Sequence, residues 1–164
     1  MKLETGSYQA LAGRLQMRIQ DLDLVVQRIA LLMTKAEETA DDGYLDGVAL
    51  NLHSFYTGME SCFEEIARTI DGALPSGSNW HQELLQQMSA DLRDLRPAVI
   101  RRSTRDCLDE YRAFRHLVRN VYTFNLKPER LKYLASDAGT CFEDCKQDIE
   151  SFLGFLRALS QQSD

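Results

Sequence analysis

The sequence predicts an all-α protein, an antiparallel up-and-down bundle of four long helices and one shorter helix. Apolar residues recur at alternating steps of three and four along most of the chain, which is the spacing of one helix face. Strand-like alternation of apolar and polar residues does not occur. Short stretches with glycine or proline separate the periodic segments, as the loops between neighbouring antiparallel helices require.

Length and composition indicate one globular domain spanning residues 1–164. The chain is 44% hydrophobic and 27% charged, with three prolines and nine glycines, which is ordinary for a folded protein. Its formal net charge of −6 argues against a protein that coats nucleic acid through overall charge. A local basic site remains compatible with that charge.

The first two helices are expected at about 8–38 and 45–70, each with one apolar stripe. The first stripe contains Leu15, Ile19, Leu22, Val26, Ile29, Met33 and Ala36, and the second contains Leu45, Val48, Leu52, Phe55, Met59, Cys62 and Ile66. Gly72 follows the second helix, which is the usual place for a helix-ending glycine.

The second half of the chain is expected to contain the shorter helix and two long ones. The shorter helix covers about 80–92, and the long helices cover about 103–124 and 137–159. Pro128 stands between the long helices and is expected to open a separate short turn, because proline disfavours helix in the residue before it.

The cysteines Cys62, Cys107, Cys141 and Cys145 contain no CxxC pair and no histidine at metal-ligand spacing. We interpret them as buried reduced thiols, because cysteine packs as a small hydrophobic residue. A metal or redox role for Cys141 and Cys145, one helical turn apart, is the alternative. No metal and no cofactor is expected.

A cytoplasmic protein without membrane contact is expected. No apolar run approaches the roughly 20 residues that a membrane span needs. The first residues, "MKLETGSYQALAGR", lack the charged-then-apolar order of a signal peptide.

The segment "FRHLVRNVYTF", residues 114–124, is basic and aromatic within an acidic chain. At about 100° per residue, a helix over this region has two separate faces. The packing face contains Cys107, Tyr111, Phe114, Val118 and Val121. The basic face contains Arg112, Arg115, His116, Arg119 and Thr123, with Asn120 beside it.

Two interpretations of the basic face stay open. Like charges four residues apart disfavour a helix by a few tenths of a kcal/mol per pair, so something should offset them. One interpretation is internal pairing with Asp106, Asp109, Glu110 or acids of neighbouring helices. The other is a bound phosphate chain, which arginine contacts well through its planar fork of donors.

The basic face contains the groups that metal-free RNA cleavage needs. That reaction requires a base for the proton of the 2′-hydroxyl and a cation for the crowded phosphate. Arg119 is the candidate cation, His116 the candidate base and Asn120 the candidate positioning residue. Arg112 and Arg115 are the candidate contacts to the RNA backbone.

The stretch "EYRAFRHLVRNVYTFNL", with Arg-Asn near the end of a bundle helix, resembles the HEPN superfamily and specifically its HepT-like toxins. These toxins belong to prokaryotic toxin–antitoxin pairs. The resemblance implies a metal-independent ribonuclease that works as a homodimer, with the motif-bearing helices forming a cleft. It also implies a nucleotidyltransferase antitoxin, which in some members silences the toxin by adding AMP to a tyrosine near the motif.

The chain departs from the motif of the family it resembles. That motif is an Arg, often followed by Asn, with a His four to six residues on and a Tyr two positions later. Arg119 and Asn120 match its start, but Phe124 stands at the His position when four residues intervene. His116 is then the candidate replacement and Tyr122 the candidate modified hydroxyl. The alternatives are a catalytically inactive bundle that serves as a protein-interaction or RNA-binding module, and a purely structural bundle.

The other polar residues receive structural interpretations. His53 and His81 are interpreted as surface or capping histidines. Glu60, Glu64 and Glu65 form an acidic cluster, interpreted as a solvated face or as partners for the arginines near residue 115. A metal site on this cluster would need a second group of ligands, such as an ExxH, which the sequence lacks.

Overall fold

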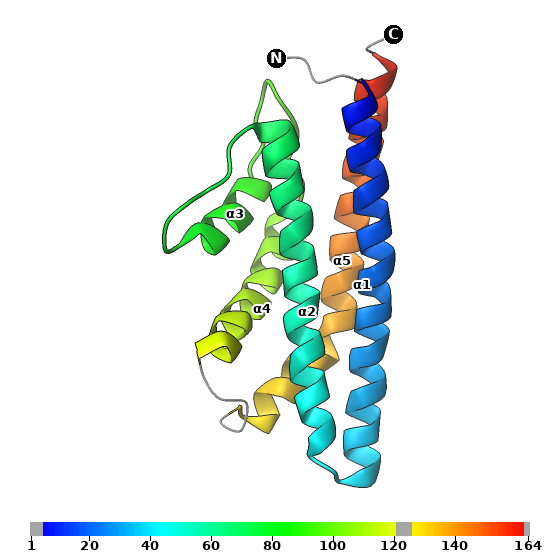
Figure 1. Cartoon of the computed structure of the whole chain (residues 1–164), viewed down its shortest axis with the longest axis vertical. Coiled ribbons are helices and arrows are strands. Elements are labelled where there is room, and N and C mark those ends of the chain that lie inside the picture. The colour runs from blue at the N-terminus through cyan, green and yellow to red at the C-terminus, as the bar shows by residue number, and fades with distance from the viewer. Residues whose placement is uncertain (1–4, 121–125, 163–164) are drawn as a thin grey trace.

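The computed structural model describes residues 5–120 and 126–162, which form five α-helices and one π-helical segment (Figure 1). The helices are α1 (Thr5–Thr39), α2 (Gly43–Ile66), α3 (Trp80–Met88), α4 (Arg102–Asn120) and α5 (Pro128–Gln161), and α2 continues into the π-helical turn η1 (Ala67–Asp71). The long helices α1, α2, α4 and α5 alternate in direction. The prediction of an all-α up-and-down bundle is therefore confirmed.

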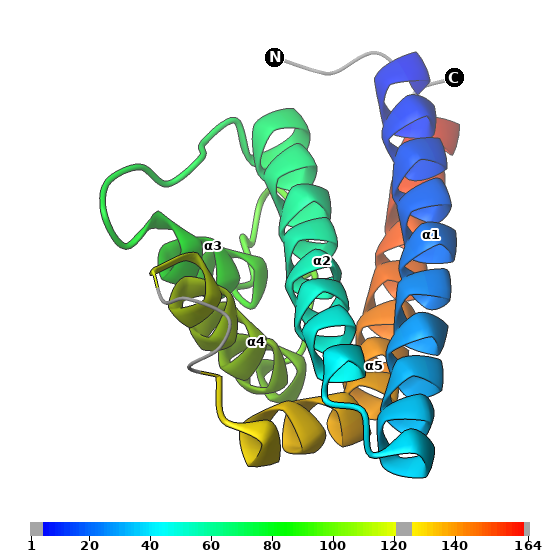
Figure 2. The same cartoon turned by 60° about the horizontal axis from the view of Figure 1, so that its bottom comes forward.

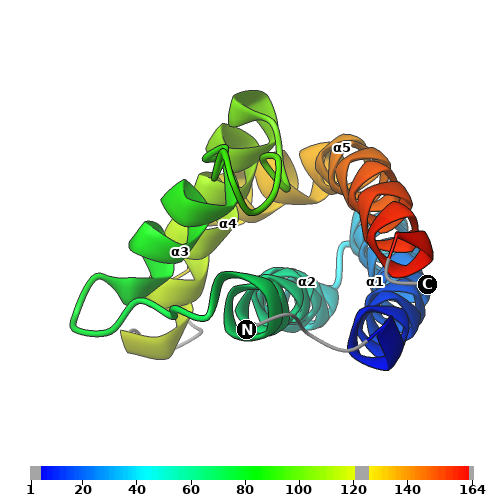
Figure 3. The same cartoon turned by 90° about the horizontal axis from the view of Figure 1, so that it is seen from above.

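Two groups of helices make up the bundle. Helix α1 packs along both α2 and α5, whereas α3 packs on α4 and α2, so α3 and α4 lie side by side, away from α1 (Figure 3). The first turns of α5 cross beneath α4 and α2 before the helix runs beside α1 (Figure 2). Helix α4, which carries the basic face, thus contacts α2, α3 and α5.

The core forms where the apolar stripes meet. Apart from Leu45, which is partly buried, every residue of the predicted second stripe is buried, and Leu15, Ile19, Leu22 and Ile29 of the first stripe are buried too. An aromatic cluster joins three helices, because the ring of Phe55 lies 5.2 Å from that of Tyr111 and 6.2 Å from that of Phe142. Gly58 lets α1 approach α2 closely, since a Cβ there would lie 2.4 Å from Leu22.

Two predicted helix boundaries are wrong. Helix α5 begins at Pro128 rather than near Asp137, because proline at the first helical position removes an N–H that would have no partner anyway. Leu131, Leu134 and Ala138 then extend the buried stripe without a break. Helix α3 ends at Met88, before the predicted end at residue 92. The predicted seam residue Val121 lies outside the described residues.

The early end of α3 coincides with a buried ion pair. Arg96 and Asp71 are almost fully buried, and the guanidinium NH2 donates to Oδ2 of Asp71 at 2.7 Å. The same guanidinium donates to the carbonyl oxygens of Gln87, Ala90 and Pro97. Arg96 therefore ties the end of η1 to the end of α3 and to the connection that leads into α4.

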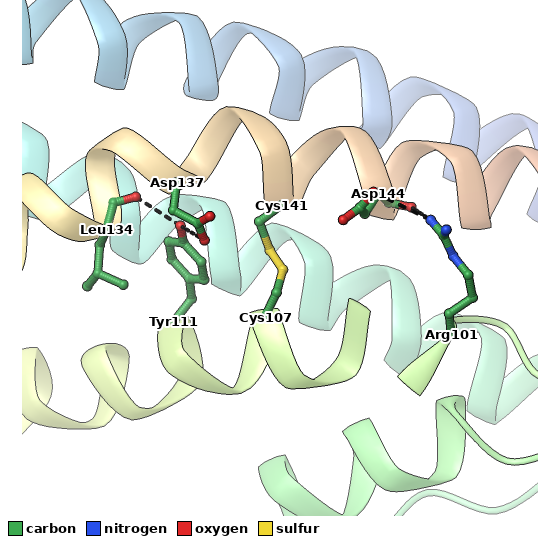
Figure 4. Close-up of a disulfide and its surroundings, with 7 residues drawn as sticks. All are labelled: Arg101, Cys107, Tyr111, Leu134, Asp137, Cys141 and Asp144. Atoms are coloured by element: carbon green, nitrogen blue, oxygen red, sulfur yellow. Dashed lines mark hydrogen bonds and ion pairs between the residues drawn. A yellow bond between two sulfur atoms is a disulfide. The ribbon is translucent and has the colours of Figure 1, made fainter. Parts of the chain in front are cut away.

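Helices α4 and α5 are joined by polar contacts and by a disulfide (Figure 4). The hydroxyl of Tyr111 donates to the carbonyl oxygen of Leu134 at 2.9 Å. Asp148 accepts hydrogen bonds from the backbone N–H of Arg101, just before α4, and from its side chain. These contacts fix the start and the middle of α4 on α5.

The disulfide links Cys107 to Cys141, whose Cα atoms lie 6.1 Å apart. The interpretation of all four cysteines as reduced thiols is therefore wrong for this pair, because the packing of α4 on α5 brings the two side chains within bonding reach. Cys62 and Cys145 are buried free thiols, as predicted. Burial raises the pKa of the Cys62 thiol to about 12.

Opening the Cys107–Cys141 bond should lower the free energy of unfolding. The bond closes a segment of 34 residues, and the chain-entropy model gives such a loop about 4 kcal/mol. Urea unfolding with and without a reducing agent measures the difference. A Cys107→Ser variant should match the reduced protein and respond to no reductant, whereas four free thiols in protein purified without reductant would contradict the pairing.

Replacing Arg96 should be among the most damaging changes in the chain. Arg96→Ala leaves the carboxylate of Asp71 buried without its main cation, which costs about 3–5 kcal/mol in comparable buried pairs. Chemical unfolding of Arg96→Ala and of the exposed matched control Arg93→Ala measures the two losses. Equal losses in the two variants would show that the pair does not hold this connection.

Candidate functional site

A cavity of about 440 Å³ lies between the start of α3 and α4. Its lining residues are Ser78, Asn79, His81, Gln82, Arg112, Arg115 and His116. Three residues of the predicted basic face, Arg112, Arg115 and His116, are thus brought together at one concave surface. The structure adds His81 to them, from a helix that the sequence did not connect with this site.

Arg112 is partly neutralised within its own helix. Its Nε lies 2.6 Å from Oδ1 of Asp109, three residues earlier, and its side chain is 23% exposed. Asp109 was one of the acids expected to offset the positive charges of α4, and it does so for this arginine. The pair leaves the guanidinium at the cavity, where it remains part of the lining.

Arg115 contacts a threonine of α2 and the ring of His81. Its Nε donates to Oγ1 of Thr57 on α2 at 3.3 Å, and one terminal nitrogen lies 3.5 Å from each ring nitrogen of His81. Within the described residues it has no ion pair with a carboxylate, because none lies within 4.0 Å. Its positive charge is therefore directed toward the cavity without a neighbouring anion in contact.

His81 connects α3 to a buried acid of α2. Its Nδ1 lies 2.7 Å from Oε2 of Glu60, which is only 3% exposed. The interpretation of His81 as a surface or capping histidine is wrong, since it is the partner of a buried carboxylate. No periodic pattern could reveal this contact, because the two residues are 21 positions apart on different helices.

Among the described side chains, the other two acids of the cluster pair with arginines outside α4. Glu65 pairs with Arg14 at 3.1 Å and with Arg18 at 2.8 Å, both from α1. Glu64 pairs with Arg68, in the continuation of its own helix, at 2.9 Å. The interpretation of Glu64 and Glu65 as partners for the described arginines of α4 is therefore wrong, whereas Glu60 reaches α4 through His81.

Tyr56 lies behind the cavity beside Glu60. Burial raises the pKa of its hydroxyl above the ordinary range, and the neighbouring Glu60 carboxylate raises it further. Arg112 and Arg115 act in the opposite direction on the same pKa. The hydroxyl thus stays protonated at neutral pH, between one buried anion and two cations.

Arg119 and Asn120 are the last two residues of α4. The helix continues through Arg119 and Asn120, but their side chains, together with Tyr122 and Phe124, lie outside the described residues. His116 is exposed on α4. The structure therefore places Arg112, Arg115 and His116 at the cavity. The roles of the Arg119, Asn120 and Tyr122 side chains stay predictions.

Among the described residues, no three His, Cys, Asp or Glu side chains are grouped so that they could hold a metal ion. No helix there is long and apolar enough to cross a membrane.

The fold and the site define a helical bundle with a polycationic cavity on α4. The family model of the HepT-like proteins matches residues 47–156, which include α3, α4 and the cavity residues. The chain belongs to the HepT-like family, within the HEPN superfamily. No curated protein and no solved structure matches the chain.

The raised pKa of Tyr56 should make the protein lose stability in alkaline solution. Unfolded tyrosine ionises near pH 10, whereas buried Tyr56 keeps its proton. Above pH 10 the unfolded state therefore binds fewer protons, and the free energy of unfolding falls by up to about 1.4 kcal/mol per pH unit for this group. Urea unfolding between pH 8 and 11 should show a shallower fall for Tyr56→Phe.

The variant Tyr111→Phe is a parallel test of this pH dependence, since burial also raises the pKa of Tyr111. It should flatten the dependence in the same way. Equal slopes for the unaltered protein and Tyr56→Phe would show that Tyr56 ionises normally in the folded state.

Proposed function

We propose that the chain is the toxin of a toxin–antitoxin pair, a metal-independent endoribonuclease that acts through the basic face of α4. The observation that carries this proposal is the convergence of Arg112, Arg115 and His116 on one cavity. Membership of the HepT-like family supports it, since HEPN-type proteins of this kind are often ribonuclease toxins. The toxin acts in the cytoplasm as a single domain, residues 1–164, and as a homodimer.

Each proposed site residue has a role in cleaving the RNA backbone. Arg119 stabilises the negative charge on the reacting phosphate, and Asn120 positions it. His116 transfers protons, because an imidazole can both accept and donate a proton. Arg112 and Arg115 bind the flanking phosphates through their guanidinium forks. No metal ion or cofactor takes part.

The proposed partner is a nucleotidyltransferase antitoxin. It neutralises the toxin by occupying the basic face or by attaching AMP to the hydroxyl of Tyr122, two residues after Asn120. A bulky negative group at that position would repel the RNA phosphates by like charge.

A second candidate function is that of a catalytically inactive bundle which binds RNA or an acidic protein through the same face. Two observations favour it. In its shortest form, the family motif has a histidine at the position that Phe124 occupies in this chain. The pair of Arg112 with Asp109 also offsets part of the positive charge of the basic face from within α4.

Expression of the unaltered chain without its partner should arrest growth and degrade RNA. Arg119→Ala and His116→Ala should each lower the rate of cleavage of a fluorescent RNA by at least about 100-fold, the usual scale for such groups. His53→Ala, on α2 and outside the cavity, is the matched control and should retain full activity.

The second candidate function predicts a different result for the same set of proteins. The unaltered chain would then retain RNA or the nucleotidyltransferase in a binding assay but cleave nothing. Absence of both growth arrest and cleavage, with a correctly folded protein, would overturn the ribonuclease proposal.

A further inference from the structure

His81 is an imidazole that is held on two sides at the cavity. Its Nδ1 is bound to Glu60 at 2.7 Å, and the indole of Trp80 covers its ring at a centroid distance of 3.7 Å. The His81 side chain is nevertheless 22% exposed, and it lines the cavity together with Arg112 and Arg115. A fixed orientation combined with access to a cavity distinguishes it from a histidine that only fills the core.

The contact with Glu60 determines which ring nitrogen of His81 carries the lone pair that can accept a proton. The buried carboxylate accepts a hydrogen bond from the Nδ1–H of His81, so the neutral ring carries its lone pair on Nε2. The carboxylate also stabilises the imidazolium that forms when Nε2 takes a proton, as an orienting acid does in a catalytic triad. A terminal nitrogen of Arg115 lies 3.5 Å from Nε2.

We propose that His81 is the general base of RNA cleavage in this protein, with Glu60 as its positioning residue and His116 as the general acid. This assignment rests on the proposed ribonuclease function. It supplies a proton-transfer pair, His81 from α3 and His116 from α4, which line the same cavity. The chain needs such a pair because Phe124 occupies the position of the histidine in the family motif.

The substrate is RNA, because the reaction uses its 2′-hydroxyl. Nε2 of His81 takes the proton of the 2′-hydroxyl while the 2′-oxygen forms a bond to the adjacent phosphorus. The bond from phosphorus to the 5′-oxygen breaks, and protonated His116 donates its proton to that leaving oxygen. The products are a 2′,3′-cyclic phosphate and a 5′-hydroxyl, and no other reactant is consumed.

The positive charge of arginine stabilises the transition state of this step. The crowded phosphate gains negative charge as the new bond forms, and a preorganised cation lowers its energy most in a site that limits water. Arg119 keeps its proposed role on this reacting phosphate. Arg115 touches the ring of His81 and has no carboxylate partner among the described residues, so the flanking phosphate that it binds would lie next to the base. Hydrogen bonding to Thr57 holds that guanidinium in place.

Cleavage of a single-site RNA by the full-length protein tests the assignment. His81→Gln and His116→Ala should each lower kcat by at least about 100-fold, and a substrate with a 2′-deoxy sugar at the site should not be cut. Glu60→Gln should lower kcat with KM unchanged and move the acidic limb of the pH–rate profile, which reports the general base. His53→Gln is the matched control, and circular dichroism with thermal unfolding verifies the fold of each variant.

A change of leaving group separates the base from the acid. A substrate with sulfur in place of the bridging 5′-oxygen needs no proton on its leaving group, because a thiolate leaves readily. It should restore cleavage by His116→Ala but not by His81→Ala. Free imidazole added to His81→Ala should restore cleavage of the ordinary substrate, which a merely structural role of His81 would not produce.

The outcomes distinguish this assignment from the proposed function. Full cleavage by His81→Gln, or restoration of His81→Ala by the sulfur substrate, overturns the assignment and leaves the ribonuclease intact. No cleavage by the unaltered, folded protein overturns both. Loss of activity in His81→Gln with the expected pattern of restoration supports both.

Discussion

The arrangement of the site depends on the buried pair of Arg96 and Asp71. A buried guanidinium is costly unless its donors are satisfied, and Arg96 satisfies them with Asp71 and with carbonyl oxygens around the end of α3. The backbone N–H of Val99 adds a 2.8 Å hydrogen bond to the carbonyl oxygen of Met88. Together these contacts fix α3 between the end of η1 and the beginning of α4, and so they place His81 against α4.

Three helices contribute side chains to the site, with α3 and α4 lining the cavity and α2 supporting them from behind. Helix α2 supplies the buried acid Glu60 and the hydroxyl of Thr57, α3 supplies His81, and α4 supplies the cations. Because α4 is also joined to α5 by the Cys107–Cys141 bond and by Tyr111, the cationic face is supported from the side opposite the cavity. A site assembled on packed helices holds its groups more precisely than one assembled on loops.

The sequence predicted the helices and the basic face because both depend on local spacing. The stripe through Leu52, Phe55 and Met59 became core, and the side chains of Arg112, Arg115 and His116 reached one cavity. Local spacing carries no information about contacts between distant residues. The sequence therefore predicted neither the Glu60–His81 pair nor the Cys107–Cys141 bond. The start of α5 was missed for a local reason, because proline both ends and begins helices.

The distribution of charge explains how an acidic chain can present a cationic cavity. Glu64 and Glu65 are engaged by arginines of η1 and α1, so their charges are compensated away from α4. Glu60 contacts the ring of His81, which in turn contacts Arg115, so the ring stands between the acid and the arginine. Arg115 therefore benefits from a buried anion without being neutralised by direct contact, which leaves its donors available for a phosphate. For the proposed ribonuclease, a net charge of −6 would favour selectivity, since it opposes unspecific adhesion to nucleic acid and leaves binding to the local site.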